Sequence, residues 1–394
     1  MIFAISLLAA ALQAAEPVPA AQAPGASSAT AAAPSVATAA AAGSPVAAIA
    51  QPPAWFRPAH GVHLTGWGAG SVKTRRSILR QLQAAELNTV VIALKEYDGY
   101  MFVRDVPLAR ETGAYVNAIP DLPGCVKEFK AAGIYTIARI VLFKDNHLAR
   151  RRPELAVHTP SGGIWANAKG VAWVDPYRRE IWDYNLDIAS RAAAAGFDEI
   201  QFDYVRFPSD GNVRRCRYSR PGHNDRTANQ NLIAFLAAAR ERLKPLGVKI
   251  SICVFGMITT DDSGMGIGQH ITDLTRQVDF VSPMMYPSHY SKGIYGLKNP
   301  NRSPYQTIQY GTRDAVARLG PEAWRLRPYF QDFSLGVRYH EAQVRAQILA
   351  AAQQGVTSWV LWNPQNRYTW SALRYNNQPI SRLAPTPRSE TSQP

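Results

Sequence analysis

Charged and aromatic residues cluster directly after short apolar runs in this sequence. Segment 95–99 reads Lys-Glu-Tyr-Asp-Gly, segment 143–145 reads Phe-Lys-Asp, and segment 203–208 reads Asp-Tyr-Val-Arg-Phe-Pro. Segments of similar character lie at 285–290, 331–333 and 362–364. Two carboxyl groups can cleave a glycosidic bond, one as the acid and the other as the nucleophile or base. Tryptophan and tyrosine rings suit the apolar faces of sugars, so these segments together predict a carbohydrate site.

Asp203 is the strongest candidate for a catalytic carboxylate. Gln201 and Asp203 share one side of an otherwise apolar run that is predicted to be a strand. A carboxylate in such a run is costly to bury unless it is paired or functional. The structural alternative is an ion pair of Asp203 with Arg206 or with a lysine. We predict that Asp203 acts as a nucleophile or a base.

The second catalytic carboxylate is less well specified by the sequence. Asp332, Glu96 and Asp145 each follow a predicted strand. We prefer Asp332 and Glu96, with Asp145 next, and Asp261 and Asp262 remain further alternatives. A general acid needs apolar surroundings that raise its pKa, whereas nearby lysine or arginine lowers the pKa of a carboxyl group and favours a charged nucleophile.

Further residues near the predicted strand ends are expected to bind the sugar rather than to react with it. They combine cations, carboxylates, amides and aromatic rings, a mixture that can meet both the hydroxyl rim and the apolar face of a pyranose. The predicted substrate-binding residues are Lys95, Asp98, Arg139, Lys144, Asp145, Trp173, Tyr204, Arg206, Tyr286, His289, Gln331, Trp362 and Asn363.

Metal and cofactor chemistry have little support in the sequence. None of the eight histidines belongs to a His-Glu-x-x-His motif. His60 and His63 are three residues apart, a spacing that places them on opposite faces of a strand. The three cysteines are widely spaced, and no Gly-x-Gly-x-x-Gly turn follows the first predicted strand. We expect neither a metal site nor a cofactor.

The order of the predicted elements favours a (β/α)8 barrel. Runs rich in β-branched and aromatic residues alternate with helical patterns that end near Gly or Asn. In this fold the active site forms at the C-terminal ends of the strands, where the candidate residues lie. The predicted strands are 62–67, 89–94, 135–143, 199–207, 249–255, 280–286, 326–333 and 358–362, and helices are predicted at 73–85, 122–132, 178–195, 228–243 and 340–354.

Both ends of the chain differ in composition from its centre. The N-terminal apolar run, followed by small residues, is typical of a secretory signal peptide, which we predict at residues 1–23. Residues 24–53 are rich in alanine and proline and predict a disordered linker, and residues 381–394 predict a disordered tail. The barrel domain is therefore predicted at 54–380. We expect export to the periplasm, the cell envelope or the extracellular space.

The formal net charge of +14 predicts attraction to anionic partners. The arginine-rich stretches 150–152 and 214–226 lack the regular interleaving of aromatic residues that single-strand binders have and the pattern of a recognition helix. We therefore expect no nucleic-acid binding. The expected partner is a carbohydrate polymer, with an acidic or amino-sugar polymer as one candidate. We expect a monomer that can associate with the envelope through its N-terminal segment.

The strand ends together resemble those of a bacterial family of glycoside hydrolase-like proteins of unknown function. The most specific match is Asp-Glu-Ile-Gln-Phe-Asp-Tyr-Val-Arg-Phe-Pro at 198–208. Further matching segments are Ala-Arg-Ile-Val at 138–141, Phe-Lys-Asp at 143–145, Met-Tyr-Pro-Ser-His-Tyr at 285–290 and Gln-Asp-Phe at 331–333. The resemblance covers residues 61–362 and implies a TIM barrel related to glycosidases, but it implies little about the substrate.

Two better-known groups of barrels share part of this pattern. α-Amylase-like enzymes carry an aspartate nucleophile after strand four and an assisting aspartate after strand seven, which Asp203 and Asp332 resemble. The acid glutamate that those enzymes have after strand five is missing here. Chitinase-like barrels end strand four in Asp-x-Asp-x-Glu, where this chain has Gln201, Asp203 and Val205. The resemblance therefore supports Asp203 and leaves the identity of the acid open.

The leading prediction is an exported glycoside hydrolase that cleaves a cell-envelope or extracellular polysaccharide. The alternative is a barrel that binds polysaccharide or cell-wall glycan without cleaving it, because the set of carboxylates is incomplete. A lyase or a transglycosylase is a third alternative. The separation of the carboxyl groups is the discriminating geometry. About 5–5.5 Å indicates a retaining hydrolase and about 6.5–9.5 Å an inverting one, whereas the absence of a second carboxyl group facing Asp203 would favour binding.

Overall fold

The computed structural model describes residues 49–375 and 378–382. The predicted signal peptide lies outside these residues, as do most of the predicted linker and most of the predicted tail. The folded unit extends slightly beyond the predicted 54–380 at both ends. Ile49 packs against the core, and Arg382 still forms an ion pair with the body of the domain.

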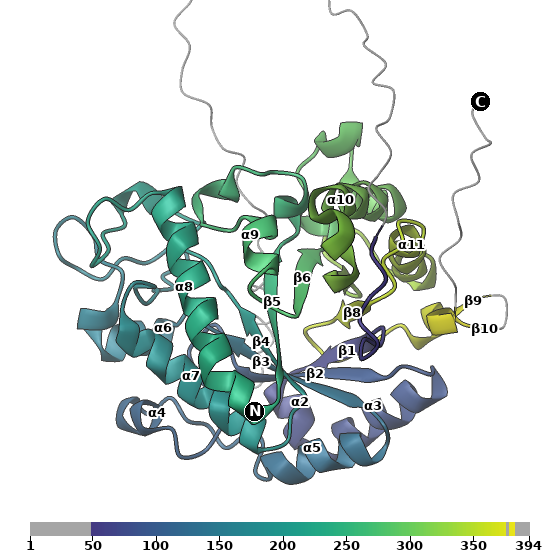
Figure 1. Ribbon diagram of the computed structural model, residues 1–394, viewed down its shortest axis with the longest axis horizontal. Coiled ribbons are helices and arrows are strands. Elements are labelled where there is room, and N and C mark those ends of the chain that lie inside the picture. Colours follow the sequence, from purple (N-terminus) through teal and green to yellow (C-terminus); the bar gives the residue numbers. More distant parts are fainter. Residues whose placement is uncertain (1–48, 376–377, 383–394) are drawn as a thin grey trace, which may run out of the picture.

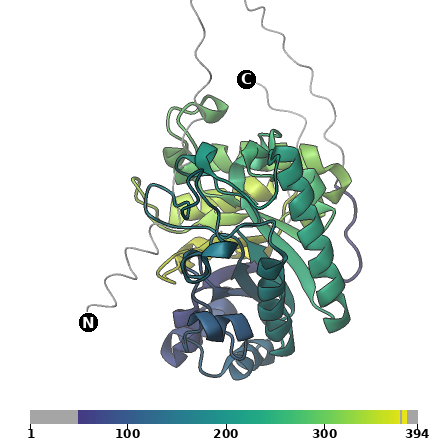
Figure 2. The same ribbon diagram turned by 90° about the vertical axis from the view of Figure 1, so that its left-hand side faces the viewer.

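Eight parallel strands close into a barrel, in which β8 pairs back to β1. The predicted (β/α)8 fold is therefore confirmed. Figure 1 shows the strands at the centre of the molecule with helices around them, and Figure 2 shows the N-terminal and C-terminal halves of the chain on opposite sides. The strands are β1 (His60–Leu64), β2 (Thr89–Lys95), β3 (Tyr135–Val141), β4 (Glu199–Asp203), β5 (Lys249–Phe255), β6 (Phe280–Met285), β7 (Tyr329–Gln331) and β8 (Trp359–Trp362).

Helices connect the strands, and side-chain caps fix where several of them begin. Ser71 caps α3 by accepting a hydrogen bond from the Thr74 amide, and Asn224 and Thr227 form a capping box at the start of α8. No helix in the described residues is long and apolar enough to cross a membrane. The helices are α2 (Gly66–Gly70), α3 (Val72–Ala84), α4 (Pro107–Thr112), α5 (Leu122–Ala131), α6 (Asn146–Arg151), α7 (Arg179–Ala194), α8 (Asp225–Leu243), α9 (Ile271–Thr275), α10 (Pro304–Leu319) and α11 (Glu341–Ala352).

Side chains along each strand alternate between the helix layer and the barrel interior. On β2, Val90 packs in the large core shared with the helices, whereas Val91 belongs to the smaller cluster inside the barrel. On β4 the interior positions are taken by Glu199, Gln201 and Asp203, each at most 1% exposed. A single strand therefore places three polar side chains inside the barrel, and each of them needs a partner.

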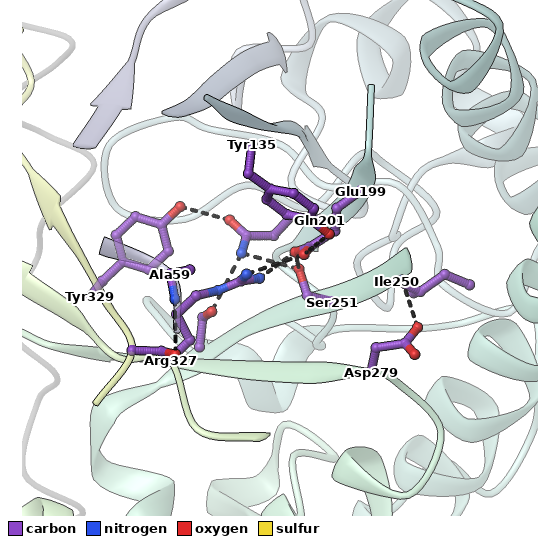
Figure 3. Close-up of polar contacts among 11 residues, drawn as sticks. Ala59, Tyr135, Glu199, Gln201, Ile250, Ser251, Asp279, Arg327 and Tyr329 are labelled. Carbon is purple, nitrogen blue, oxygen red and sulfur yellow. Dashed lines mark hydrogen bonds and ion pairs between the residues drawn. The ribbon is translucent and has the colours of Figure 1, made fainter. Parts of the chain in front are cut away.

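The two polar residues nearest the N-terminal end of β4 are satisfied by a network at the base of the barrel (Figure 3). Arg327 forms an ion pair with Glu199, with Nη1 at 3.1 Å from Oε2. The Ser251 hydroxyl also donates to Glu199. The Tyr329 hydroxyl donates to Gln201 Oε1 at 2.7 Å. Complementary charges and donors thus hold β4, β5 and β7 together at this end.

We predict that Arg327→Met lowers the free energy of unfolding by about 3–5 kcal/mol, because it leaves the Glu199 carboxylate buried without its counter-charge. Urea titration of the purified protein measures the loss. The matched control is Arg110→Met, which removes an arginine from an exposed pair with Asp105 and should have little effect. Equal effects of the two variants would show that the buried network does not stabilise the barrel.

Candidate active site

Arg139 joins two carboxylates at the C-terminal end of the barrel. Its Nε and Nη2 atoms donate to Asp203 Oδ2 at 2.9 and 2.6 Å, and its Nη1 donates to Glu96 Oε2 at 3.2 Å. The Asp203 side chain is 2% exposed, whereas the Glu96 side chain is 24% exposed. We call Glu96, Arg139 and Asp203 the Arg139 cluster. It contains two of the three carboxylates that the sequence proposed as catalytic.

An irregularity in β2 brings Glu96 to this cluster. The register of β2 with β3 shifts between Ala93 and Lys95, as at a β-bulge. Lys95 thereby faces the helix layer, where its ammonium forms an ion pair with Asp145 at 2.8 Å and donates to Asn185 of α7 at 3.0 Å. Glu96 is the next residue, and it reaches Arg139 in the barrel interior.

Asp203 is held by the turn that follows β4. Its Oδ1 accepts a hydrogen bond from the Tyr204 amide at 2.6 Å. Tyr204 has a φ of 51°, a left-handed conformation that costs a residue other than glycine about 1–3 kcal/mol. Such strain persists only where the surrounding structure imposes it, which is common at active sites. The turn brings the Tyr204 ring to 5.8 Å from the Trp173 ring, centroid to centroid.

The surroundings of Glu96 favour its protonated form. Loss of solvent raises the pKa of Glu96, and the Asp98 and Asp203 carboxylates raise it further, while the Arg139 charge acts in the opposite direction. Burial also opposes the charge on Arg139, but Asp203 and Glu96 raise the pKa of its guanidinium well above the usual value. A protonated carboxyl suits a general acid, and a carboxylate beside a permanent cation suits a nucleophile or base.

His63 lies beside the Arg139 cluster and was not recognised in the sequence as a site residue. It is 2% exposed, and neither ring nitrogen has a hydrogen-bond partner among the described residues. Burial and the positive charge of Arg139 hold the pKa of His63 well below its usual value, so the ring is neutral. The sequence does contain a pattern that predicts this position. Side chains alternate along β1, and since Val62 and Leu64 pack against the helices, His63 must face the barrel interior.

Lys144, Trp173, Tyr204 and Arg206 form a second group, which we call the cation–aromatic cluster. The Lys144 ammonium lies 5.1 Å from the centre of the Tyr204 ring, and the Arg206 guanidinium carbon lies 4.8 Å from it. Both cations also lie over Trp173, at 6.0 and 4.9 Å. The loops after β3 and β4 thus bring together four residues that the sequence proposed as substrate-binding.

Aromatic side chains from β6, β7 and β8 form a third group. The Tyr286 and Trp362 rings stack, with centroids 5.4 Å apart and an interplanar angle of 27°. Phe333 packs edge-on against Trp362 at 5.1 Å, and His289 lies 5.4 Å from Tyr286. The charge of Asp203 acts on Tyr286, which places this aromatic group near the Arg139 cluster.

Asp332 does not join the Arg139 cluster, contrary to its predicted catalytic role. Its Oδ2 accepts from the Thr369 amide and its Oδ1 from the Thr369 hydroxyl, both at 2.7 Å. The side-chain amide of Asn363 donates to the Asp332 carbonyl. Asp332 and Asn363 therefore anchor the loop after β8. Both carboxylate oxygens of Asp332 accept hydrogen bonds from Thr369 in this loop.

Other predicted substrate contacts also have structural partners. Lys95 and Asp145 are fully buried against α7, and Asp145 also caps α6, so a sugar at the mouth of the barrel does not reach them. Gln331 bonds to the backbone of the β6 and β7 loops. Asp98 accepts from a backbone amide in the turn after β2. The sequence places Lys95 in the barrel interior because regular alternation along β2 would turn it inward. The bulge in β2 turns it toward the helices instead.

Metal-binding residues do not gather anywhere in the part of the chain that the structure describes. No group of three or more histidine, cysteine, aspartate or glutamate side chains there is arranged to hold an ion. The three cysteines are buried and free.

The raised pKa of Glu96 predicts how Glu96→Gln changes stability with pH. A carboxyl whose folded pKa is raised stabilises the fold below its unfolded pKa of about 4.3, and this stabilisation is lost as the pH rises through the folded pKa. Glutamine does not ionise. The free energy of unfolding of Glu96→Gln should therefore rise relative to the parent between about pH 4 and pH 7. Denaturant titrations of the variant and the parent at about pH 4 and pH 7 measure the two free energies of unfolding. A parent that gains stability relative to the variant between these pH values would contradict the raised pKa.

Comparisons with solved structures agree with the barrel fold. The glycoside hydrolase domain of PgaB (BpsB) from Bordetella bronchiseptica has a TM-score of 0.55 and 14% identity, over 78% of this chain and 94% of that chain. Alpha-L-fucosidase isoenzyme 2 from Paenibacillus thiaminolyticus has a TM-score of 0.57 and 14% identity, over 80% of this chain and 48% of that chain. At this identity the likeness concerns the fold alone.

A sequence relative is found among the solved structures as well. A hypothetical protein from Ruminiclostridium thermocellum is 34% identical over 52% of this chain and 99% of that chain, with a TM-score of 0.45. A search of curated proteins found no match. Residues 61–368 match the family described as "Putative glycosyl hydrolase domain". Because this match covers most of the chain and nearly the whole barrel, the resemblance seen in the strand ends is confirmed, and the protein belongs to this glycosyl hydrolase family.

Proposed function

We propose that this protein is an exported glycoside hydrolase that cleaves a cell-envelope or extracellular polysaccharide. The observation that carries the proposal is the Arg139 cluster, in which one guanidinium contacts both Asp203 and Glu96 at the mouth of the barrel. In this fold, polar groups at the C-terminal ends of the strands are those that act on substrate. Membership of a glycosyl hydrolase family agrees with that chemistry.

The two carboxyl groups divide the reaction between them. Glu96 is the general acid, which gives its proton to the glycosidic oxygen as the bond to the anomeric carbon breaks. Asp203 either attacks the anomeric carbon directly or removes a proton from the attacking water. Arg139 contacts both carboxyl groups, with Nη2 at 2.6 Å from Asp203 Oδ2 and Nη1 at 3.2 Å from Glu96 Oε2. The contact of Glu96 with Arg139 supports Glu96 rather than Asp332 as the partner of Asp203, whereas burial raises the pKa of both carboxyl groups.

The aromatic groups around the Arg139 cluster suit sugar rings. The Tyr286 and Trp362 rings stack, and the partly exposed Trp362 offers an apolar face to a sugar ring. His289 lies beside this pair, in the loop after β6.

Export and the envelope location rest on the sequence. The apolar N-terminal run at 1–23 and the Ala/Pro-rich segment that follows support secretion and a tether, with the barrel as the secreted part. The net charge of +14 favours an acidic or amino-sugar polymer as the partner of a monomeric enzyme that needs no cofactor.

The second candidate is a barrel that binds polysaccharide without cleaving it. The observation in its favour is that both oxygens of Asp203 already have partners, Arg139 at Oδ2 and the Tyr204 amide at Oδ1. A carboxylate held in this way can be a structural counter-ion. Hydrolysis assays separate the two functions directly.

We predict that the protein releases reducing ends from at least one polymer in a panel of neutral, acidic and amino-sugar polysaccharides and peptidoglycan. Asp203→Asn and Glu96→Gln should each lower the rate by about 10²–10⁴-fold, the range found for acid–base residues. Asp332→Asn is the matched control, because it removes a buried carboxylate outside the Arg139 cluster and should largely retain the rate. Circular dichroism melts show whether each variant is folded.

Three results would count against this assignment. Full activity in folded Asp203→Asn would remove the proposed nucleophile. A loss in Asp332→Asn as large as that in Glu96→Gln would restore Asp332 as the acid. Retention of one polymer on an affinity gel, with no reducing-end release from any, would favour the binding barrel.

The assignment of Glu96 as the acid also predicts the alkaline limb of the pH–rate profile. Glu96 must carry a proton to act, so kcat/KM should fall as the pH rises through its pKa, which lies above the usual value. In Glu96→Gln this limb should disappear together with most of the rate. A limb that persists unchanged in Glu96→Gln would belong to another group.

A further inference from the structure

Lys144 and Arg206 are buried cations without a carboxylate partner. Four cationic side chains are buried in the described part of the chain, namely Lys95, Lys144, Arg206 and Arg327. Lys95 forms an ion pair with Asp145 and Arg327 with Glu199. No carboxylate in the described residues forms an ion pair with either of the other two, which are 6% and 5% exposed.

The partners that these two cations do have are weak for buried charges. Among the residues that the structure describes, the contacts of the Lys144 ammonium are with aromatic rings, at 5.1 Å from the centre of Tyr204 and 5.2 Å from that of Tyr97. The Arg206 Nη1 donates to the Phe207 carbonyl at 3.1 Å and to a serine hydroxyl, but its remaining donors have no acceptor in the described residues. Cation–π contacts stabilise a cation by less than the loss of solvent destabilises a buried charge.

Nearby groups add unused donors rather than a counter-ion. The indole N–H of Trp173 is buried and has no acceptor within the described part of the chain, and both cations lie over the same ring. The charges of Asp210 and Asp203 act on Arg206, but neither carboxylate is close enough to form an ion pair with it. Three kinds of donor, namely ammonium, guanidinium and indole, therefore meet at one place without an anion.

The place of this group relative to the reaction centre follows from the chain itself. Tyr204 is the residue after Asp203, and the centre of its ring lies 5.1 Å from the Lys144 ammonium and 4.8 Å from the Arg206 guanidinium carbon. A sugar whose anomeric carbon is at Asp203 would have its neighbouring substituents or the adjacent sugar unit over this ring. A negative group on that sugar would reach both cations.

We propose that the cation–aromatic cluster of Lys144, Trp173, Tyr204 and Arg206 is a subsite for the anionic group of an acidic sugar. The group is a carboxylate, as in a uronic acid, or a phosphate or sulfate ester, which share the charged oxygens that these donors require. This subsite rests on the proposed function for its place next to Asp203, and it specifies that the substrate is an acidic glycan. Binding of the anion itself requires no hydrolysis.

The test measures anion binding to the full chain by calorimetry at constant ionic strength, with sodium D-glucuronate, inorganic phosphate and, as the neutral match, D-glucose. We expect saturable binding of at least one anion and much weaker binding of glucose. Lys144→Met and Arg206→Met should each weaken anion binding about tenfold or more, because each removes one charge from a desolvated site. The preferred anion distinguishes a carboxylate from a phosphate substituent.

The matched control is Arg179→Met, which removes another arginine that lies over a tryptophan, at 3.6 Å from the Trp182 ring, but on the outer helix α7. It should leave anion binding unchanged. Without anion, Lys144→Met and Arg206→Met should melt at the parent's temperature or above it, because they remove an uncompensated buried charge.

Two results would overturn the subsite. One is anion binding no tighter than that of glucose. The other is lower melting temperatures in both variants with anion binding intact, the result of a purely structural role for the cations. Asp203→Asn separates this proposal from the hydrolase itself, because the variant should keep anion binding while losing turnover. Anion binding in a protein that hydrolyses no polymer would leave the subsite standing and contradict the hydrolase.

Discussion

The burial of three polar residues on the inner side of β4 is the constraint on which this barrel depends. Glu199, Gln201 and Asp203 alternate along one strand, and each is nearly or fully excluded from solvent. At the base, Arg327 neutralises Glu199, and hydroxyl groups satisfy Gln201 (Figure 3). At the mouth, Arg139 does the same for Asp203 but leaves Glu96 partly open to solvent. The same strand thus carries a structural ion pair at one end and the proposed catalytic carboxylate at the other.

Two local irregularities convert this regular scaffold into a site. The bulge in β2 sends Lys95 to the helix layer and Glu96 to Arg139, so adjacent residues of opposite charge serve different layers. The left-handed Tyr204 donates its amide hydrogen to the Asp203 carboxylate at the end of β4, and its ring lies near the Lys144 and Arg206 cations. Irregularities of this kind cost free energy, which the many contacts of the barrel offset.

The fold could be predicted from the sequence because each strand is a compact apolar run and the helices lie between them. The strand-four segment carried most of the information about the site, since Asp203 interrupts an apolar run and must be satisfied. Arg139, Lys144, Tyr204 and Arg206 also lie where strand ends meet, as the barrel requires. These residues could be found because their positions depend mainly on regular alternation and on strand order.

The remaining positions depend on contacts that no local pattern contains. Alternation alone would turn Lys95 inward, and only the register shift in β2 reverses it. Asp332 ends a strand as a catalytic aspartate would, but Thr369, far along the chain, occupies both of its oxygens. From the sequence alone, His63 is considered only as a metal ligand. Val62 and Leu64 pack against the helices, so the alternation of side chains along β1 turns His63 into the barrel.

The most direct test of the central claim is a crystal structure of Asp203→Asn with a fragment of a polymer that the parent cleaves. The distance to measure runs from the glycosidic oxygen of the bound fragment to the nearer carboxyl oxygen of Glu96. The assignment of Glu96 and Asp203 predicts a hydrogen-bond distance of about 2.6–3.2 Å, with the anomeric carbon facing residue 203 on the other side. A glycosidic oxygen within that distance of another carboxyl, with Glu96 still bound only to Arg139, would contradict the account.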